Sequence, residues 1–212
     1  MVGEKVRRRD PSCLPSANQV HEDDTAGRLE VVTAARAMLR DGLVVGMVGN
    51  ISLRLGDRVL ITPTRMPYDR MSPTDLSTLD LAARHLAGPS PSSELPLHLA
   101  LYRQRPEVRS VVHTHSPYAT AWSFLGEPLL PITEENRYYG IGVVHTYSAG
   151  QTSSEELARG VIEAQGNASA VLLGRHGVLT SGSSVAAALD IARVVERQAQ
   201  IAWILRGARD PG

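Results

Sequence analysis

The chain has 212 residues, and its 22 basic and 22 acidic side chains cancel to a formal net charge of zero. Aromatic residues make up only 4% of the sequence, and no stretch reaches the roughly 18 consecutive apolar residues of a membrane span, so neither nucleic acid nor a membrane is an expected partner. The single cysteine, Cys13, excludes an internal disulfide, and we expect one cytoplasmic domain.

Residues 1–24 mix Arg, Pro, Ser and Asp with few apolar side chains, a composition that predicts a disordered leader. We expect the folded domain to occupy residues 25–212. Its first element is predicted to be a helix from Arg28 that ends at Asp41-Gly42, a pair typical of helix C-termini.

The rest of the chain changes irregularly between strand and helix patterns. A hairpin comes first, in which Gly56-Asp57 joins the strands 51–55 and 59–62. The further elements expected are a strand at 79–81, a helix opened by Ser92-Ser93-Glu94 that ends before Pro106, a strand at 108–115, a helix at 117–124, a strand at 141–146, a helix at 155–165, a strand at 170–173 and a helix at 185–205. Without the regular alternation of a doubly wound fold, this order predicts a single α/β (α+β-like) domain, with a central, largely antiparallel sheet flanked by helices.

Three histidines are candidate metal ligands. His113 and His115 are two residues apart on a predicted strand, so their imidazoles project from the same face and can reach one ion. An isolated His-x-His pair serves equally well to hydrogen-bond a strand end. His176 follows another apolar strand, between two glycines that allow a close approach of the backbone. Three neutral imidazoles would leave Zn²⁺ with an open fourth position, as in catalytic zinc sites.

Glu94 lies at the start of a predicted helix, after a loop rich in proline and serine. A carboxylate there can simply stabilise the helix dipole, and Ser92 or Ser93 can cap the helix. The same hydroxyls and free backbone N–H groups also form a natural phosphate cradle. Small polar turns that could complete it are Gly49-Asn50 and Thr62-Pro63-Thr64. The chain has no glycine-rich nucleotide motif, so a nucleotide ligand has no support.

An ordered set of short segments resembles the class II aldolase/adducin family over roughly residues 28–206. The segments are Gly49-Asn50-Ile51-Ser52, Ile61-Thr62-Pro63-Thr64, Pro91-Ser92-Ser93-Glu94, Val112-His113-Thr114-His115 and His176-Gly177. Each is common by itself, but the set in this order and spacing is specific. The resemblance implies the fold of that family, with residues 25–212 as its catalytic domain.

The resemblance also implies roles for these residues. Zn²⁺ would be held by His113, His115 and His176, with Mn²⁺ or Co²⁺ as alternative metals. Glu94 would ligate the resting metal and then act as the catalytic base. The positions that match phosphate contacts of the family are Gly49, Asn50, Thr64, Ser92 and Ser93. Because family members are typically homotetramers with active sites at subunit interfaces, we expect a homotetramer here too.

The implied activity is the cleavage of a ketose 1-phosphate, of the L-fuculose or 5-deoxyribulose type, into dihydroxyacetone phosphate and a small aldehyde. A divalent ion can stabilise the enediolate that cleavage leaves. Lys5 is the only lysine, so a Schiff-base aldolase is excluded. The scaffold also suits a methylthioribulose-1-phosphate dehydratase, a pentulose-phosphate 4-epimerase or a keto-acid phosphate decarboxylase. The retained metal ligands argue against a non-catalytic, adducin-like scaffold.

Three departures from the family pattern concern the substrate. Arg65 follows Thr-Pro-Thr where the family has glycine, and it could either block a phosphate contact or supply a cation. Shortly after Pro131, where the family has a tyrosine proton donor, this chain has two glutamates, with two tyrosines nearby but out of register. Residues 206–212 lack the aromatic tail that closes the aldehyde side. The candidate substrate contacts are therefore Arg65, Glu134, Glu135, Tyr138 and Tyr139.

Overall fold

The computed structural model describes residues 17–148 and 154–209. Within these ranges eight strands form one sheet in the order β4-β3-β2-β1-β5-β8-β7-β6, and every neighbouring pair is antiparallel except β6 and β7. The strands are β1 (Asn50–Leu55), β2 (Arg58–Ile61), β3 (Ser77–Asp80), β4 (His85–Ala87), β5 (Ser110–Thr114), β6 (Thr146–Tyr147), β7 (Ala170–Leu173) and β8 (Gly177–Gly182). The predicted class, a largely antiparallel sheet flanked by helices, is confirmed.

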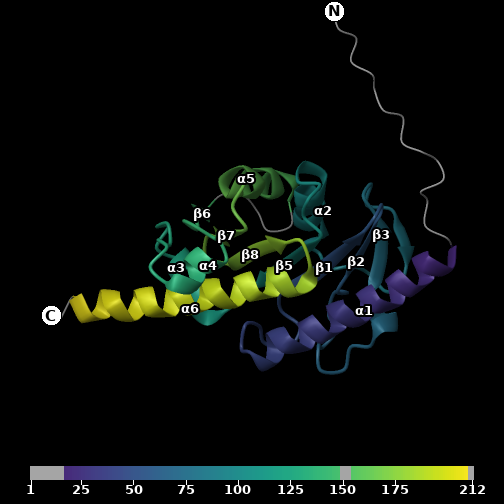
Figure 1. The fold of residues 1–212 in the computed structure, drawn as a ribbon, viewed down its shortest axis with the longest axis horizontal. Helices are drawn as coiled ribbons and strands as arrows, with labels where there is room; N and C mark the ends of the chain where they lie inside the picture. Colours follow the sequence, from purple (N-terminus) through teal and green to yellow (C-terminus); the bar gives the residue numbers. More distant parts are fainter. Residues whose placement is uncertain (1–16, 149–153, 210–212) are drawn as a thin grey trace, which may run out of the picture.

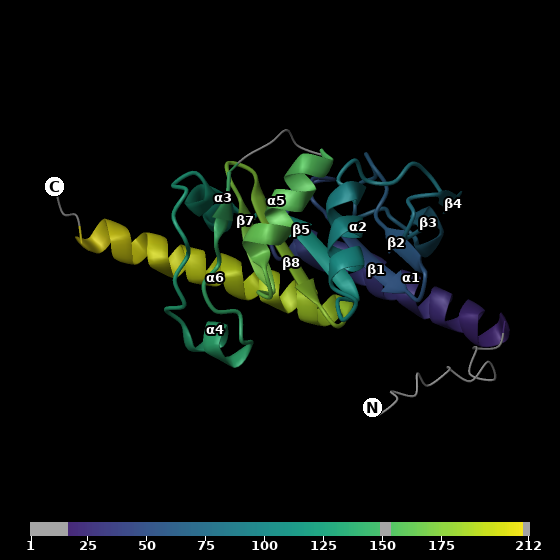
Figure 2. The same cartoon turned by 90° about the horizontal axis from the view of Figure 1, so that it is seen from above.

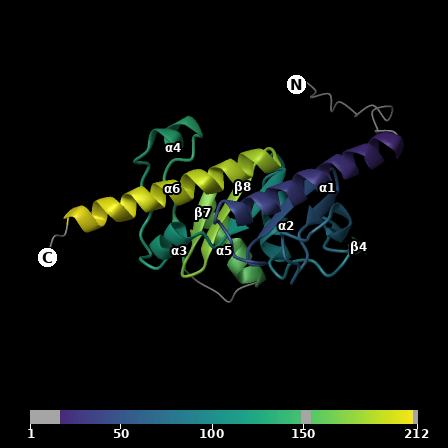
Figure 3. The ribbon, with the colours of Figure 1, turned by 90° about the horizontal axis from the view of Figure 1, so that it is seen from below.

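Helices cover both faces of the sheet (Figures 1 and 3). The helices are α1 (Ala17–Arg40), α2 (Leu95–Gln104), α3 (Pro117–Ser123), α4 (Glu134–Tyr138), α5 (Glu155–Gln165) and α6 (Val185–Arg209), and a short 3-10 helix, η2, spans Pro73–Asp75. Helices α1 and α6 lie on one face, and α2 and α5 lie on the other (Figure 2). None of the helices described has the length and apolar character that crossing a membrane would require.

The alternation of side chains along β5 explains why both faces need cover. Val112 packs in a core with residues of α1 and α6, whereas its neighbour Val111 packs in a core with residues of α2 and α5. Successive side chains of a strand point to opposite faces, so every apolar residue of this central strand finds a helix above or below. By the same alternation, His113 points toward the face of α2.

Most elements begin and end where the sequence patterns indicate. Helix α1 ends at Arg40, and Gly42 has a positive φ of 70°, as expected of a residue that terminates a helix. The β1–β2 hairpin turns at Gly56-Asp57, with Leu55 opposite Arg58. Helix α5 begins after Ser154, whose side chain accepts a hydrogen bond from the Leu157 N–H.

Other expectations are wrong. Helix α1 begins at Ala17 rather than at Arg28. The leader expected over residues 1–24 stays a prediction, and residues 1–16 lie outside the described residues. The helical turns before Arg28 are polar and lack apolar periodicity, although an Asp24–Arg28 ion pair of 3.4 Å joins successive turns. The predicted strand at 141–146 is reduced to β6, because Val144 makes only an isolated bridge to Leu129. Strands β4 and β8 and helix α4 were not predicted.

Candidate metal centre

The antiparallel pairing of three central strands brings distant residues to one end of the sheet. Strand β5 runs antiparallel to both β1 and β8, so the end of β5 lies beside the beginnings of the other two. Asn50, the first residue of β1, is therefore directly opposite His113, and Gly177 begins β8 beside Thr114. The segment before β8 carries His176 to the same place, although His176 is far from His113 in the chain.

The imidazoles of His113, His115 and His176 converge. Their ring centroids are 4.7 to 4.8 Å apart, and each offers a ring nitrogen within 4.8 Å of the other two. The Nδ1 atom of His113 lies 3.0 Å from the carbonyl oxygen of Val178, which can only accept, so Nδ1 carries the proton. The Nε2 atom of His113 is left with a free lone pair and lies 2.9 Å from the Nε2 atom of His115.

Gly177 allows this convergence. A Cβ atom at this position would lie 2.2 Å from the carbonyl oxygen of Thr114 and 3.2 Å from the Cε1 atom of His113. The first distance is far inside van der Waals contact, so only glycine lets β8 start this close to the end of β5. The predicted reason for a glycine beside His176, a close approach of the backbone, is confirmed here.

Glu94 faces the three histidines from the beginning of α2. Its two carboxylate oxygens lie 3.3 Å from the Nε2 atoms of His113 and His176, and Oε2 also accepts a hydrogen bond of 2.6 Å from the Asn50 amide. Burial alone would raise the pKa of Glu94, but the neighbouring His113 and the Asn50 hydrogen bond together hold the pKa below its usual value. The carboxylate is therefore ionised at neutral pH.

The surroundings also keep His115 and His176 neutral. Burial, together with the proximity of the other imidazoles, lowers the pKa of His115 to about 4 and lowers the pKa of His176 below its usual value. A neutral imidazole has the free lone pair that a metal ligand needs, so no proton has to leave before an ion can bind.

The donor set fits a divalent transition metal. Three imidazole nitrogens with one carboxylate are typical of zinc and of neighbouring first-row metals, whereas calcium and magnesium prefer oxygen ligands alone. His113, His115 and His176 would hold such an ion, and Glu94 is close enough to be a fourth ligand.

The two loops expected to bind phosphate lie side by side. An isolated bridge joins Pro63 to Pro91, the Thr64 N–H donates to Ser90 O at 3.0 Å, and the Ser92 N–H donates to Thr62 O at 3.1 Å. Thr64 and Ser93 are exposed while Ser92 is buried. The sequence suggested that Ser92 or Ser93 caps α2, and the structure differs. The N-cap residue is Glu94, whose side chain makes no capping hydrogen bond.

Gly49 and Asn50 are adjacent to these loops but are already engaged with the protein. Gly49 has a φ of 85°, its carbonyl accepts a hydrogen bond of 2.5 Å from the Tyr68 hydroxyl, and a Cβ atom there would lie 2.7 Å from His113 O. Tyr68 is fully buried, and burial raises the pKa of its hydroxyl, which keeps it a donor. The Asn50 amide contacts Glu94 and is 3% exposed.

Arg65, at the position where the family pattern has glycine, has a backbone conformation that favours glycine. Its φ is 59°, in the left-handed region that costs an ordinary residue about 1 kcal/mol. The side chain is exposed, and no ion pair to it is found in the part of the chain that the structure describes. The guanidinium of Arg65 is therefore a solvent-exposed cation directly after Thr64 in the loop.

The other candidate substrate contacts lie apart from the histidines within one chain. Glu134, Glu135 and Tyr138 belong to α4 and Tyr139 follows it, and α4 packs against α6 (Figure 2). The side chains form local ion pairs, Glu134 with Arg137 at 2.7 Å and Glu135 with Arg197 at 3.7 Å. Their exposure leaves them accessible to a neighbouring molecule but not to the metal centre of their own chain.

Sequence reasoning missed His98 and Tyr102, because a histidine on an apolar helix face gave no chemical signal. Both side chains are buried between α2 and the sheet, where His98 lies 2.5 Å from Asn50 Oδ1. The four-residue spacing of Glu94 and His98 could have indicated that His98 lies close to the candidate base. Residues four apart lie on the same face of a helix, so a candidate base should share its surroundings with His98.

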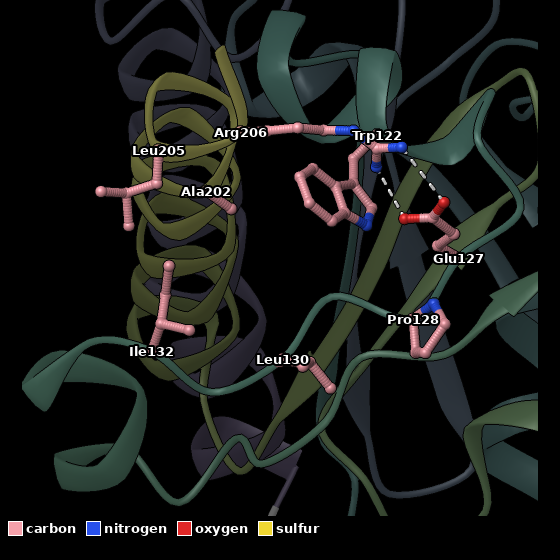
Figure 4. A pocket seen from close by; sticks show the side chains of 8 residues that line it. All are labelled: Trp122, Glu127, Pro128, Leu130, Ile132, Ala202, Leu205 and Arg206. Atoms are coloured by element: carbon pink, nitrogen blue, oxygen red, sulfur yellow. Dashed lines mark hydrogen bonds and ion pairs between the residues drawn. The ribbon is translucent and has the colours of Figure 1, made fainter. Parts of the chain in front are cut away.

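The structure has one cavity beside the histidines and another away from them. One of about 550 Å³ borders His176 and is lined by Ser148 and Arg175 among others. The other, of about 520 Å³, lies between α6 and the segment around Pro128, and its wall includes Trp122 and the ion pair of Arg206 with Glu127 at 2.7 Å (Figure 4). The second cavity contains none of the candidate site residues.

Comparisons with known proteins identify the family of the chain. Residues 29–203 match the family described as the class II aldolase and adducin N-terminal domain. The chain is 35% identical to the 3-oxo-tetronate 4-phosphate decarboxylase of Haemophilus influenzae over 88% of this chain and 91% of the relative. It is 32% identical to an L-fuculose phosphate aldolase of Escherichia coli over 86% and 85% of the two chains. The solved L-fuculose-1-phosphate aldolase of Thermus thermophilus superposes with a TM-score of 0.79 at 27% identity, covering 87% of this chain and 96% of that one.

Proposed function

The chain belongs to the class II aldolase and adducin family, and we propose that it is a metal-dependent lyase that breaks a carbon–carbon bond of a phosphorylated keto sugar. The substrate proposed first is a ketose 1-phosphate of the L-fuculose or 5-deoxyribulose type, which would give dihydroxyacetone phosphate and a small aldehyde. The observation that carries the proposal is the convergence of His113, His115 and His176 in front of the Glu94 carboxylate.

A bound divalent ion, proposed to be Zn²⁺, would supply positive charge close to the enediolate oxygens that develop when the bond breaks. The chain's own residues account for the proton. Glu94 is ionised, lies against His113 and His176, and accepts a hydrogen bond from Asn50. As an ionised carboxylate it is placed to remove the proton from the hydroxymethyl carbon of dihydroxyacetone phosphate in the condensation direction. In the cleavage direction Glu94 first takes up the proton released by the substrate hydroxyl that becomes the aldehyde, and then delivers it to the enediolate carbon.

The loops beside Glu94 support binding of the phosphate. Thr64 and Ser93 present exposed hydroxyls beside the beginning of α2, where the positive end of the helix dipole favours an anion. The Leu95 and Leu97 N–H groups of the first turn are already bonded to Ser92 O and Glu94 O. Arg65 follows Thr64 directly, so we propose that its guanidinium contributes a charge-assisted contact to the phosphate rather than blocking it.

A second candidate reaction is decarboxylation of a keto-acid phosphate. An aldol cleavage needs a group that serves the oxygen of the departing aldehyde, and the residues proposed near that position lie on α4, away from the histidines. Decarboxylation needs no such group, because the departing molecule is carbon dioxide. Loss of carbon dioxide from a 3-oxo-tetronate 4-phosphate yields the same enediolate. A relative 35% identical to this chain carries the name of that decarboxylase.

One experiment separates these reactions from each other and from the dehydratase and epimerase alternatives. The purified protein is loaded with Zn²⁺ and incubated with ketose 1-phosphates and with 3-oxo-tetronate 4-phosphate, while a coupled reductase monitors dihydroxyacetone phosphate and mass spectrometry identifies the second product. An aldehyde supports the aldolase, and carbon dioxide supports the decarboxylase. Loss of water would favour the dehydratase, and a new species of unchanged mass that chromatography separates from the substrate would favour the epimerase. No conversion of any substrate would reject the lyase.

We further propose that the chain assembles into a homotetramer with active sites at subunit interfaces. The support is an exposed apolar surface on the last turns of α6, where Trp203, Ile204 and Leu205 are 40%, 60% and 47% exposed. These turns project beyond the sheet (Figure 1), and apolar area of this kind is typical of protein contacts. Analytical ultracentrifugation tests the state, and a monomer would reject it.

A further inference from the structure

A chain of hydrogen bonds runs from the interior of the protein to Glu94. The Tyr102 hydroxyl lies 2.6 Å from Ser52 Oγ, which lies 2.7 Å from His98 Nδ1. The other ring nitrogen of His98, Nε2, lies 2.5 Å from Asn50 Oδ1, and Asn50 Nδ2 donates to Glu94 Oε2 at 2.6 Å. Tyr102, Ser52, His98 and Asn50 are at most 3% exposed, so these groups have no water to bond instead.

The orientation of the Asn50 amide determines the position of every proton in the chain. Its NH₂ group faces Glu94 Oε2, and its oxygen faces His98 Nε2. The oxygen requires a donor, so His98 Nε2 carries a hydrogen. A neutral ring then has a bare Nδ1, to which the Ser52 hydroxyl donates, and Ser52 accepts from Tyr102.

Among the residues that the structure describes, no other close hydrogen-bond partner allows the bonds of this chain to run in the opposite direction. The Tyr102 hydroxyl lies 3.5 Å from the carbonyl oxygen of Arg109, much farther than from Ser52. Full burial lowers the pKa of His98 to about 3, which keeps the ring neutral and its two nitrogens distinct. If Asn50 turned over, its oxygen would face the carboxylate and its NH₂ group would face an N–H group. Both contacts would be repulsive in a buried site.

We propose that His98 is a positioning residue: its Nε2–H holds the Asn50 amide in the one orientation that fixes the Glu94 carboxylate in front of the three histidines. This inference rests on the proposed function in one respect, the role of Glu94 as the base. His98 itself touches no substrate. Loss of hydrogen bonds that orient a catalytic group typically lowers turnover about 10- to 100-fold.

The first test is spectroscopic and needs neither metal nor substrate. Long-range ¹⁵N–¹H spectra of the ¹⁵N-labelled, metal-free protein report which nitrogen of each imidazole carries the hydrogen, and the His98 signals are assigned by their absence in His98→Gln. We expect the Nε2–H form, and we expect Asn50→Ala to disturb it. A ring protonated on Nδ1, or one that exchanges between both forms, would overturn the proposal whether or not the enzyme is active.

The second test is kinetic and uses two substitutions of His98. His98→Leu removes both ring nitrogens and should lower kcat by about 10- to 100-fold with a much smaller change in KM. His98→Gln keeps an amide donor that can reach Asn50, so it should recover most of the lost turnover. If both variants lost kcat equally, the specific role of the Nε2–H group would be excluded.

Ser110→Ala is the matched control. The Ser110 hydroxyl is fully buried in the neighbouring strand and donates to the Ser52 carbonyl oxygen at 2.8 Å, so its removal also deletes a buried hydrogen bond. It leaves the chain from Tyr102 to Glu94 intact. We expect a loss of stability with unchanged kcat, and a kcat that fell as in His98→Leu would reduce His98 to a structural role. Inactive wild-type protein with the expected tautomer would instead contradict the proposed function.

Discussion

Replacing Gly177 by alanine should disrupt the metal centre through the backbone, without removing a ligand. The new methyl group would lie 2.2 Å from Thr114 O, and ordinary contact begins at 3.4 Å, so β8 or the end of β5 must move by about 1.2 Å. The same methyl group would lie 3.2 Å from His113 Cε1. Overpacking of this kind costs about 1 to 3 kcal/mol, and the movement separates His113 from His176.

We expect Gly177→Ala to remain folded, to unfold at a lower urea concentration, and to bind zinc about 10- to 100-fold more weakly than the wild type. Urea titration and isothermal titration calorimetry measure the two effects. Gly207→Ala is the control, because the residue is helical and its new methyl group would have no neighbour within 4 Å beyond the adjoining backbone of its own helix. It should be as stable as the wild type or slightly more so, with unchanged affinity. Wild-type zinc affinity in Gly177→Ala would refute the argument.

Three further predictions concern single side chains. Glu94→Gln should fold and bind phosphate but lose about 10²- to 10⁴-fold in kcat, and near-normal turnover in a steady-state assay would remove Glu94 as the base. Stability should depend on pH through His98: its folded pKa of about 3 lies below the ordinary 6.5, so the unfolded chain takes up the proton first, and stability falls as pH drops below 6.5. Urea titrations of metal-free protein should show this slope reduced by up to about 1.4 kcal/mol per pH unit in His98→Gln, and equal slopes would contradict the assignment. Arg65→Gly should keep the local backbone and raise KM for phosphorylated substrates, whereas an unchanged KM would remove Arg65 from the phosphate site.

The convergence of the site could be predicted only in part from the sequence. The two-residue period of a strand places His113 and His115 on one face, and the structure agrees. The third histidine needed the pairing of β5 with β8, and β8 itself was not predicted. The segment of β8 is partly polar and is bounded by Gly177 and Gly182, so its sequence does not indicate a strand. It forms a strand because β5 and β7 offer hydrogen-bond partners on both sides.

The opposite error at 141–146 has the same origin. Ile141 and Val144 are apolar and buried, which is typical of a strand, but Gly142 has a φ of 72° and only Leu129 pairs with Val144. Local pattern therefore indicates burial correctly and pairing poorly. Pairing depends on which distant segment lies alongside, and the polar chain from Tyr102 to Glu94 depends on it as well.

The central claim is that His113, His115 and His176 bind one divalent metal ion. X-ray absorption at the zinc edge of the loaded protein tests it most directly, together with the same spectrum of His113→Ala. We predict about one zinc per chain with three imidazole nitrogens and additional oxygen in the wild type, and loss of the tightly bound ion in the variant. A wild-type spectrum with fewer than three imidazoles, or an unchanged site in His113→Ala, would contradict the account.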